Sequence, residues 1–177
     1  MKIFAIAAVV LGLSVAASAS ASASDLYLPE QPMTPVYDDG AFPWEGLYFG
    51  VTKGGWISAT GSSEWYIEVT KVAGFNILLG DNFVLGAEAT VSALVAPAFY
   101  LDATITGHAG ILIDDSVLIY KLGGVGFVDG DTYGILGAGV EVAIGDSLAL
   151  RGEVRAVFWD PGVDWFRPSV GLIWHLN

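Results

Sequence analysis

Apolar and polar side chains alternate with a period of two along most of the chain after residue 44, which is the spacing of a β-strand with two different faces. The alternation is clearest in residues 147–159. There, three charged side chains, Arg151, Glu153 and Arg155, share one face, and the opposite face is mostly apolar. Glycine recurs too often for stable helices, and no run is apolar for long enough to form a membrane helix.

Eight segments of this kind, each of about twelve to fifteen residues, are long enough to cross a membrane as tilted strands. They are expected near residues 45–56, 66–79, 83–94, 99–113, 117–128, 132–144, 147–159 and 165–176. Three connections are tight polar turns suited to hairpins: Gly80-Asp81-Asn82, Asp114-Asp115-Ser116 and Gly145-Asp146. The other connections, of which only the first looks long, would face the opposite end: 57–65, 95–98, 129–131 and 160–164. The pattern predicts an all-β fold, an eight-stranded antiparallel up-and-down transmembrane β-barrel.

The composition of the two faces indicates which one is outside. The polar faces are rich in Gly, Ser and Thr, which suit a crowded narrow lumen, so the apolar faces should contact lipid. Many aromatic residues fall near the strand ends beside the expected outer loops, where an interfacial girdle would lie. They are Trp56, Trp65, Tyr66, Phe99, Tyr100, Phe127, Tyr133, Phe158, Trp159, Trp165 and Phe166; Trp44, Phe83, Tyr120 and Trp174 fall nearer the other rim. A soluble β-sandwich or lipocalin-like barrel is the alternative, but it leaves this clustering unexplained.

The first residues have the layout of a secretory signal peptide: Lys2, an apolar run, and then small residues around a cleavage site. We expect cleavage after Ala23, or alternatively after Ala19. Residues 1–23 are therefore assigned to the signal peptide, 24–43 to an extended, proline-rich periplasmic lead-in, and 44–177 to the barrel.

The composition excludes several function classes. A formal charge of −12 with only seven scattered Lys and Arg residues leaves no electrostatic footprint for nucleic acid. The absence of cysteine removes disulfides, thiol catalysis and thiolate metal sites. We expect no cofactor, since the glycine-rich run at 137–142 lacks the third glycine and the helix of a dinucleotide site.

Charged residues on the polar faces are the candidate functional residues, since they would meet inside the barrel as a lumen charge network. They are Glu88, Asp102, His108, Lys121, Glu141, Arg151, Glu153, Arg155 and Arg167. Unpaired charge is costly in a poorly hydrated interior, so these groups should form ion pairs that fill and rigidify the barrel. Alternatively, the same charges could line or gate a small conductive path.

No enzymatic or metal site is expected. The two histidines, His108 and His175, are not paired at a metal-ligand spacing. A hydrolase would need Ser and His within hydrogen-bond reach, and only Ser92 with His108, on neighbouring strands, remains open for that.

The stretch Trp44-Glu45-Gly46-Leu47-Tyr48-Phe49-Gly50, followed by Gly54-Gly55-Trp56, resembles the first strand of a family of small outer-membrane β-barrels. That family includes the transmembrane domain of OmpA and small porin-like surface proteins of alphaproteobacteria. Further matches are Gly74-Phe75-Asn76, the run from Gly80 to Glu88, and Leu150-Arg151-Gly152-Glu153-Val154-Arg155. Members typically end on a phenylalanine that the barrel-assembly machinery recognises; here Leu176 takes that place and Asn177 follows it.

The resemblance implies a place in the bacterial outer membrane, with outer-membrane lipid and, during biogenesis, the barrel-assembly machinery as partners. The function expected first is a structural barrel that contributes to envelope integrity and presents surface loops. A pore of low conductance for ions or small solutes is the second reading. A third is adhesion or partner binding through the 57–65 loop with Trp65 and Tyr66. A lipid-modifying enzyme has the least support, and the oligomeric state stays open.

Overall fold

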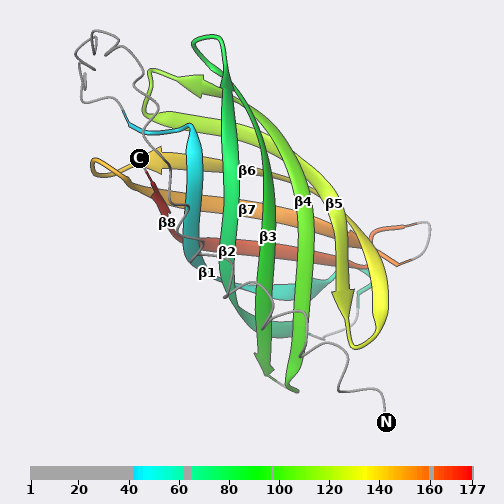
Figure 1. The fold of residues 1–177 in the computed structure, drawn as a ribbon. Coiled ribbons are helices and arrows are strands. Elements are labelled where there is room, and N and C mark those ends of the chain that lie inside the picture. Colours follow the sequence, from blue (N-terminus) through cyan, green and yellow to red (C-terminus); the bar gives the residue numbers. More distant parts are fainter. Residues whose placement is uncertain (1–41, 62–64, 97, 160–161, 177) are drawn as a thin grey trace, which may run out of the picture. The chain divides into compact units, whose positions relative to one another are not determined.

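The computed structural model describes residues 42–61, 65–96, 98–159 and 162–176, so the predicted signal peptide and nearly all of the lead-in lie outside the described residues. The described part is an all-antiparallel β-barrel (Figure 1). Its strands are β1 (Gly46–Ser58), β2 (Trp65–Leu79), β3 (Phe83–Ala96), β4 (Tyr100–Ile113), β5 (Val117–Val128), β6 (Asp131–Ala143), β7 (Leu148–Phe158) and β8 (Trp165–His175). The predicted fold is confirmed, and every predicted strand end falls within two residues of the observed one. No helix in the described ranges is long and apolar enough to cross a membrane.

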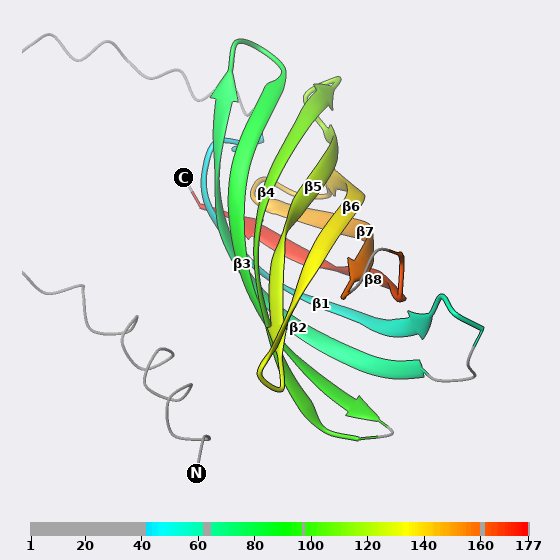
Figure 2. The same ribbon diagram turned by 90° about the vertical axis from the view of Figure 1, so that its right-hand side faces the viewer.

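The barrel closes because β1 pairs with both β2 and β8, while all other pairs join consecutive strands (Figure 2). The paired residues can be followed once around the barrel. Ile57 of β1 pairs with Phe166 of β8, and the path continues from strand to strand to Phe75 of β2, which pairs with Leu47 of β1. This offset of ten residues is the shear of the barrel, and it requires strongly tilted strands around a narrow interior. Such an interior is filled by its own side chains.

The connections explain how neighbouring strands keep their register. Asp114 and Asp115 both have positive φ, 50° and 54°, and the Ser116 amide donates to the Ile113 carbonyl at 3.3 Å. They form a tight turn within a three-residue connection, because Ile113 pairs with Val117. We call the end with this turn the inner end and the opposite one the outer end. At the outer end, the β7–β8 connection spans 159–164 and is as long as the β1–β2 connection at 59–64. The expectation of a single long outer loop was therefore wrong.

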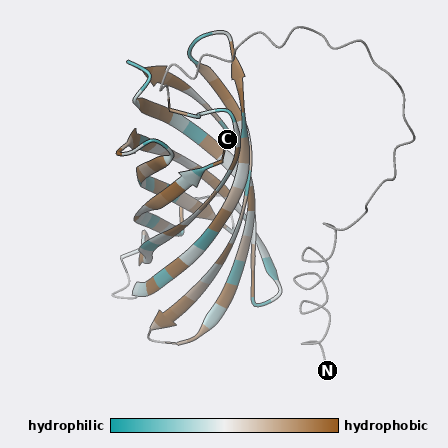
Figure 3. Ribbon diagram, turned by 60° about the vertical axis from the view of Figure 1, so that its left-hand side comes forward, coloured by the Kyte–Doolittle hydropathy of each residue, from teal (hydrophilic) through white to brown (hydrophobic). Residues whose placement is uncertain are grey.

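On β3, β4 and β7 the exposed face is mostly apolar and the buried face carries most of the polar side chains, as the alternation predicts. Figure 3 shows the corresponding change between hydrophobic and hydrophilic residues along the strands. On β4, Leu101 and Ile105 are 59% and 61% exposed, whereas Asp102 and Thr104, which lie between them in the sequence, are each 1% exposed. Large exposed apolar side chains occur on every strand, so the outer surface is an apolar belt. A protein in water rarely exposes a continuous apolar surface of this extent.

Among the described residues, all arginines lie on the inner face of the barrel and all lysines lie on its outer face. The three arginines point into the lumen, whereas Lys53, Lys71 and Lys121 point outward. The prediction that Lys121 belongs to the lumen network is therefore wrong. Its neighbours Tyr120 and Leu122 are buried inside, and the two-residue period then places Lys121 outside. A lysine can occupy such a position because its long apolar stem lies along the wall while its charged end reaches toward a polar surface.

Removing an outward lysine should stabilise the barrel in lipid. Lys53 and Lys71 lie near the middle of β1 and β2, facing Val69 and Val51 across the strand pair. A lysine at the lipid-facing midplane costs about 2 to 4 kcal/mol. Lys53→Leu and Lys71→Leu should therefore each raise the urea midpoint in phospholipid vesicles, while Val69→Leu on the same face should leave it nearly unchanged. Lower midpoints for both lysine variants would contradict a lipid-facing position.

The aromatic girdle is only partly as predicted. Trp65, Phe99 and Phe127 are exposed near the outer strand ends, as interfacial residues should be. Trp56 and Tyr133, however, are 3% and 2% exposed and point into the barrel, so their assignment to the girdle was wrong. Two further aromatics placed near the inner rim, Trp44 and Tyr120, are also buried inside the barrel.

Candidate functional site

The lumen brings together five carboxylates and three guanidinium groups. β7 supplies Arg151, Glu153 and Arg155 in one row, because every second residue of a strand faces the same side. The remaining groups come from β2, β3, β4, β6 and β8, and all are nearly inaccessible to water. They are Glu68, Glu88, Asp102, Glu141 and Arg167.

Each arginine bridges two carboxylates. Arg151 donates to Glu88 at 2.5 Å and to Glu141 at 2.7 Å. Arg155 donates to Glu88 at 3.0 Å and also to Glu153. Glu88 therefore joins two arginines at the centre of the network.

The third arginine forms a separate group closer to the outer end. Arg167 donates to Glu68 and, at 3.2 Å, to Asp102. Its guanidinium also lies 4.3 Å from the ring centroid of Trp56. Every lumen carboxylate thus has an arginine partner, so no charge in this group is buried alone, as its stability requires.

Three tyrosines complete the hydrogen bonding of these carboxylates. Tyr48 donates to Glu88 at 2.9 Å, Tyr120 donates to Glu153 at 2.7 Å, and Tyr133 donates to Asp102 at 2.5 Å. Among the described residues, the only buried side-chain nitrogen or oxygen that lacks a partner is Nε1 of Trp56. The network is therefore almost fully satisfied, which is the condition under which buried polar groups rigidify a core.

Each of these tyrosines lies over a glycine directly opposite it on the neighbouring strand. The pairs are Tyr48 with Gly74, Tyr120 with Gly139, and Tyr133 with Gly126. A Cβ at any of these glycines would collide with the tyrosine ring. The glycines are therefore what lets the rings lie across the strands and reach the carboxylates.

The two histidines lie in the lumen and contact different partners. His175 contacts Glu141 at 3.0 Å, and His108 contacts Asn76 at 2.8 Å. The arrangement of Ser92 with His108 left open by the sequence is excluded by the register. His108 faces Gly86, which is six residues from Ser92 on β3, or about 20 Å along the strand.

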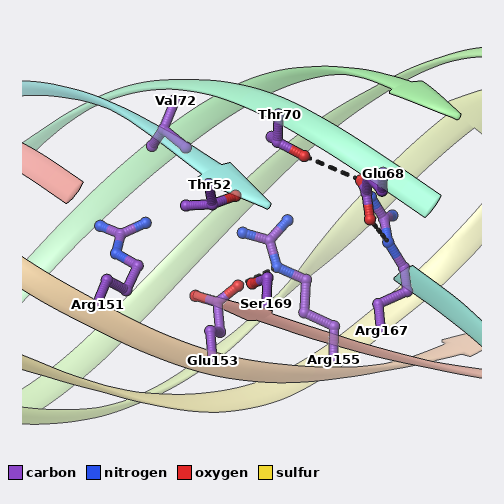
Figure 4. A pocket seen from close by; sticks show the side chains of 9 residues that line it. All are labelled: Thr52, Glu68, Thr70, Val72, Arg151, Glu153, Arg155, Arg167 and Ser169. Atoms are coloured by element: carbon purple, nitrogen blue, oxygen red, sulfur yellow. Dashed lines mark hydrogen bonds and ion pairs between the residues drawn. The ribbon is translucent and has the colours of Figure 1, made fainter. Parts of the chain in front are cut away.

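At the level of the arginines, the lumen leaves little free space. Between the arginine groups lies a polar cavity of about 10 Å³, about the room needed for one water molecule (Figure 4). At the inner end, Trp44 and Phe42 pack against His175, and the Trp44 indole donates to the Asp115 carbonyl at 2.8 Å. At the outer end, Trp56 packs against Tyr133 with ring centroids 5.7 Å apart. Side chains therefore obstruct the barrel at three levels.

Eight of the nine residues predicted for the lumen network lie in the lumen, with Lys121 as the exception. Seven of them join in ion pairs, while His108 hydrogen-bonds to Asn76. Sequence reasoning missed Glu68 as an ion-pair partner, His175 as a contact of Glu141, and the three tyrosines as donors. Glu68 carried a usable signal, because it shares its phase on β2 with Thr70 and Asn76, which are also buried.

No group of three or more potential ligand residues in the described ranges is arranged to hold a metal ion.

No family model matches the chain, and no curated protein matches it. Solved structures do resemble it. The N-terminal β-barrel domain of OprF from Pseudomonas aeruginosa matches with a TM-score of 0.51 and 10% identity over 72% of this chain and 96% of that one. The outer membrane protein Ail of Yersinia pestis, in a phospholipid bilayer nanodisc, matches with a TM-score of 0.48 and 12% identity over 73% and 99%. A de novo designed transmembrane β-barrel matches with a TM-score of 0.49 and 14% identity over 73% and 95%.

The similarity to the OprF domain confirms the fold alone, because the identity is low. The resemblance to the OmpA-type family therefore stays a prediction.

Proposed function

We propose that this chain is a bacterial outer-membrane β-barrel that contributes to envelope integrity and does not conduct ions through its lumen. The observation that carries the proposal is the combination of an apolar outer surface with an interior obstructed by paired charges. An apolar belt around a closed sheet is the form that a strand protein needs in lipid, where every backbone group must be hydrogen-bonded within the protein.

The lumen supports a mechanical role more than a transport role. Its ion pairs connect strands that are not neighbours in the sheet, such as β7 with β3 and β8 with β2. These cross-lumen contacts fix the barrel diameter in addition to the backbone hydrogen bonds of the wall. We propose outer-membrane lipid as the permanent partner, the barrel-assembly machinery as a partner during biogenesis, and no enzymatic activity.

Conductance measurement separates this proposal from the pore alternative. The protein would be refolded into lipid, its folding checked by the mobility difference between boiled and unboiled samples, and current recorded across a planar bilayer. The expected result is a folded but electrically silent barrel, because the cavity at the arginines holds about one water and cannot pass hydrated ions. Discrete, ion-selective current steps that change with Glu153→Gln would instead establish the pore.

A further inference from the structure

The outer mouth of the barrel contains a pocket of about 160 Å³. Residues at or next to the outer ends of all eight strands line it, so it lies across the barrel opening rather than on one side of the wall. Five aromatic side chains form most of its wall: Trp56, Tyr66, Tyr100, Trp159 and Trp165. We call this pocket the vestibule. The interior charge network and the proposed structural role make no use of it.

The rings of the vestibule form a connected surface. Trp165 packs against Trp56 and Tyr66, with centroids 6.1 and 5.7 Å apart, and Tyr66 packs against Tyr100 at 6.1 Å. Trp159 packs against Trp56 at 5.9 Å. The faces of aromatic rings carry partial negative charge, and several faces around one cavity attract an organic cation.

The charges at the vestibule have the same preference. Two exposed carboxylates, Asp129 and Asp131, line it. No lysine or arginine occurs among the described residues of the four outer connections. Arg167 lies beneath, against Trp56, but Glu68 and Asp102 already balance its charge. A positive ligand therefore meets rings and carboxylates without an opposing unpaired cation.

We propose that the vestibule binds a small organic cation of the quaternary ammonium type. A hard metal ion does not fit this site, because it needs about six oxygen ligands and only two carboxylates line the pocket. A drug-sized ligand does not fit either, because such ligands occupy pockets of about 300 to 1,000 Å³. The site requires the folded barrel but is independent of whether the lumen conducts.

Nuclear magnetic resonance of the tryptophan indoles tests the proposal directly. The protein, labelled with ¹⁵N at tryptophan and refolded into phospholipid nanodiscs, would be titrated with choline chloride at constant ionic strength. The indole signals of Trp56, Trp159 and Trp165 should shift and saturate, with a dissociation constant of about 1 to 10 mM. The signals of Trp44 and Trp174, which do not line the vestibule, should stay in place.

Two comparisons show whether charge and rings cause the binding. The neutral isostere 3,3-dimethylbutan-1-ol should bind at least about tenfold more weakly, because it lacks the charge that the rings attract. Combining Asp129→Asn with Asp131→Asn should raise the choline dissociation constant about fivefold, and so should Tyr100→Leu. Asp146→Asn removes a carboxylate near the inner end and serves as the matched control, with no expected change.

Three results would overturn the proposal. Equal binding of the neutral isostere would make the vestibule a general apolar pocket. Shifts reproduced by sodium chloride alone would make them an ionic-strength effect. A choline titration without saturation at concentrations tenfold above the expected range would mean that no such site exists.

Discussion

Replacing Arg151 by alanine should destabilise the barrel by about 3 to 5 kcal/mol, the usual cost of removing one partner from a buried ion pair. Arg151 is 3% exposed and bridges Glu88 and Glu141, two carboxylates on different strands. Without it, Glu141 retains only His175, and Glu88 retains Arg155 and Tyr48. The measurement is reversible urea unfolding in phospholipid vesicles, and the midpoint should fall strongly.

Two further variants separate charge from packing. Arg151→Met keeps much of the side-chain volume, so a similar loss would assign the effect to the unpaired carboxylates. Adding Glu141→Gln to Arg151→Met should recover part of the stability, because it removes one of the charges left without an arginine, and the two changes should not be additive. Lys121→Ala is the control for loss of a positive charge, since Lys121 points outward and should not be needed for stability. An unchanged midpoint for Arg151→Ala would refute the buried network.

Introducing valine at Gly74 should also be strongly destabilising, with a combined loss of about 2.5 to 6 kcal/mol. A Cβ at this position would collide with the Tyr48 ring and lie 2.7 Å from the Ala87 carbonyl oxygen, which belongs to the wall and cannot move cheaply. Overpacking a tight interior costs about 1 to 3 kcal/mol. Displacing Tyr48 also breaks its hydrogen bond to ionised Glu88, which adds about 1.5 to 3 kcal/mol.

The matched control for Gly74 is Gly152. Both are strand glycines, but a Cβ at Gly152 meets only a Val140 methyl group at 3.9 Å, an ordinary contact. Because valine favours strands, Gly152→Val should be neutral or stabilising. Tyr48→Phe measures the hydroxyl contribution separately and should cost less than Gly74→Val. If the two glycine variants had equal stability, the tyrosine and glycine pairing would have no energetic role.

The wall of the barrel was predictable because its determinants are local. The two-residue period fixes which side chains share a face, and Gly-Asp and Asp-Asp turns fix where strands end, so β3, β4 and β7 were predicted with the correct face inward. The period fails where neither face is clearly polar. In β5, glycines at 123, 124 and 126 leave little contrast between the faces, and Lys121 was placed on the wrong one.

The partners within the lumen could not be predicted in the same way. Arg167 of β8 meets Glu68 of β2, and Arg151 of β7 meets Glu88 of β3, and neither strand pair is adjacent in the sheet. Such contacts depend on closure of the sheet and on its ten-residue shear, which bring distant side chains to one level. The inward position of Trp56 could not be predicted either. A tryptophan near a strand end can lie in the interfacial girdle or fill the mouth of the barrel, and its place in the sequence does not decide between the two.

Immersion of the apolar belt in lipid is the central claim, and spin-label accessibility tests it most directly. The chain has no cysteine, so single labels can be attached at outward positions around the barrel, such as Ile105→Cys, Val125→Cys, Leu136→Cys and Val154→Cys. In refolded protein, all four labels should be accessible to oxygen dissolved in the bilayer and shielded from a water-soluble nickel chelate. High nickel accessibility and low oxygen accessibility at these positions would mean that the belt faces water, and would contradict a membrane-spanning barrel.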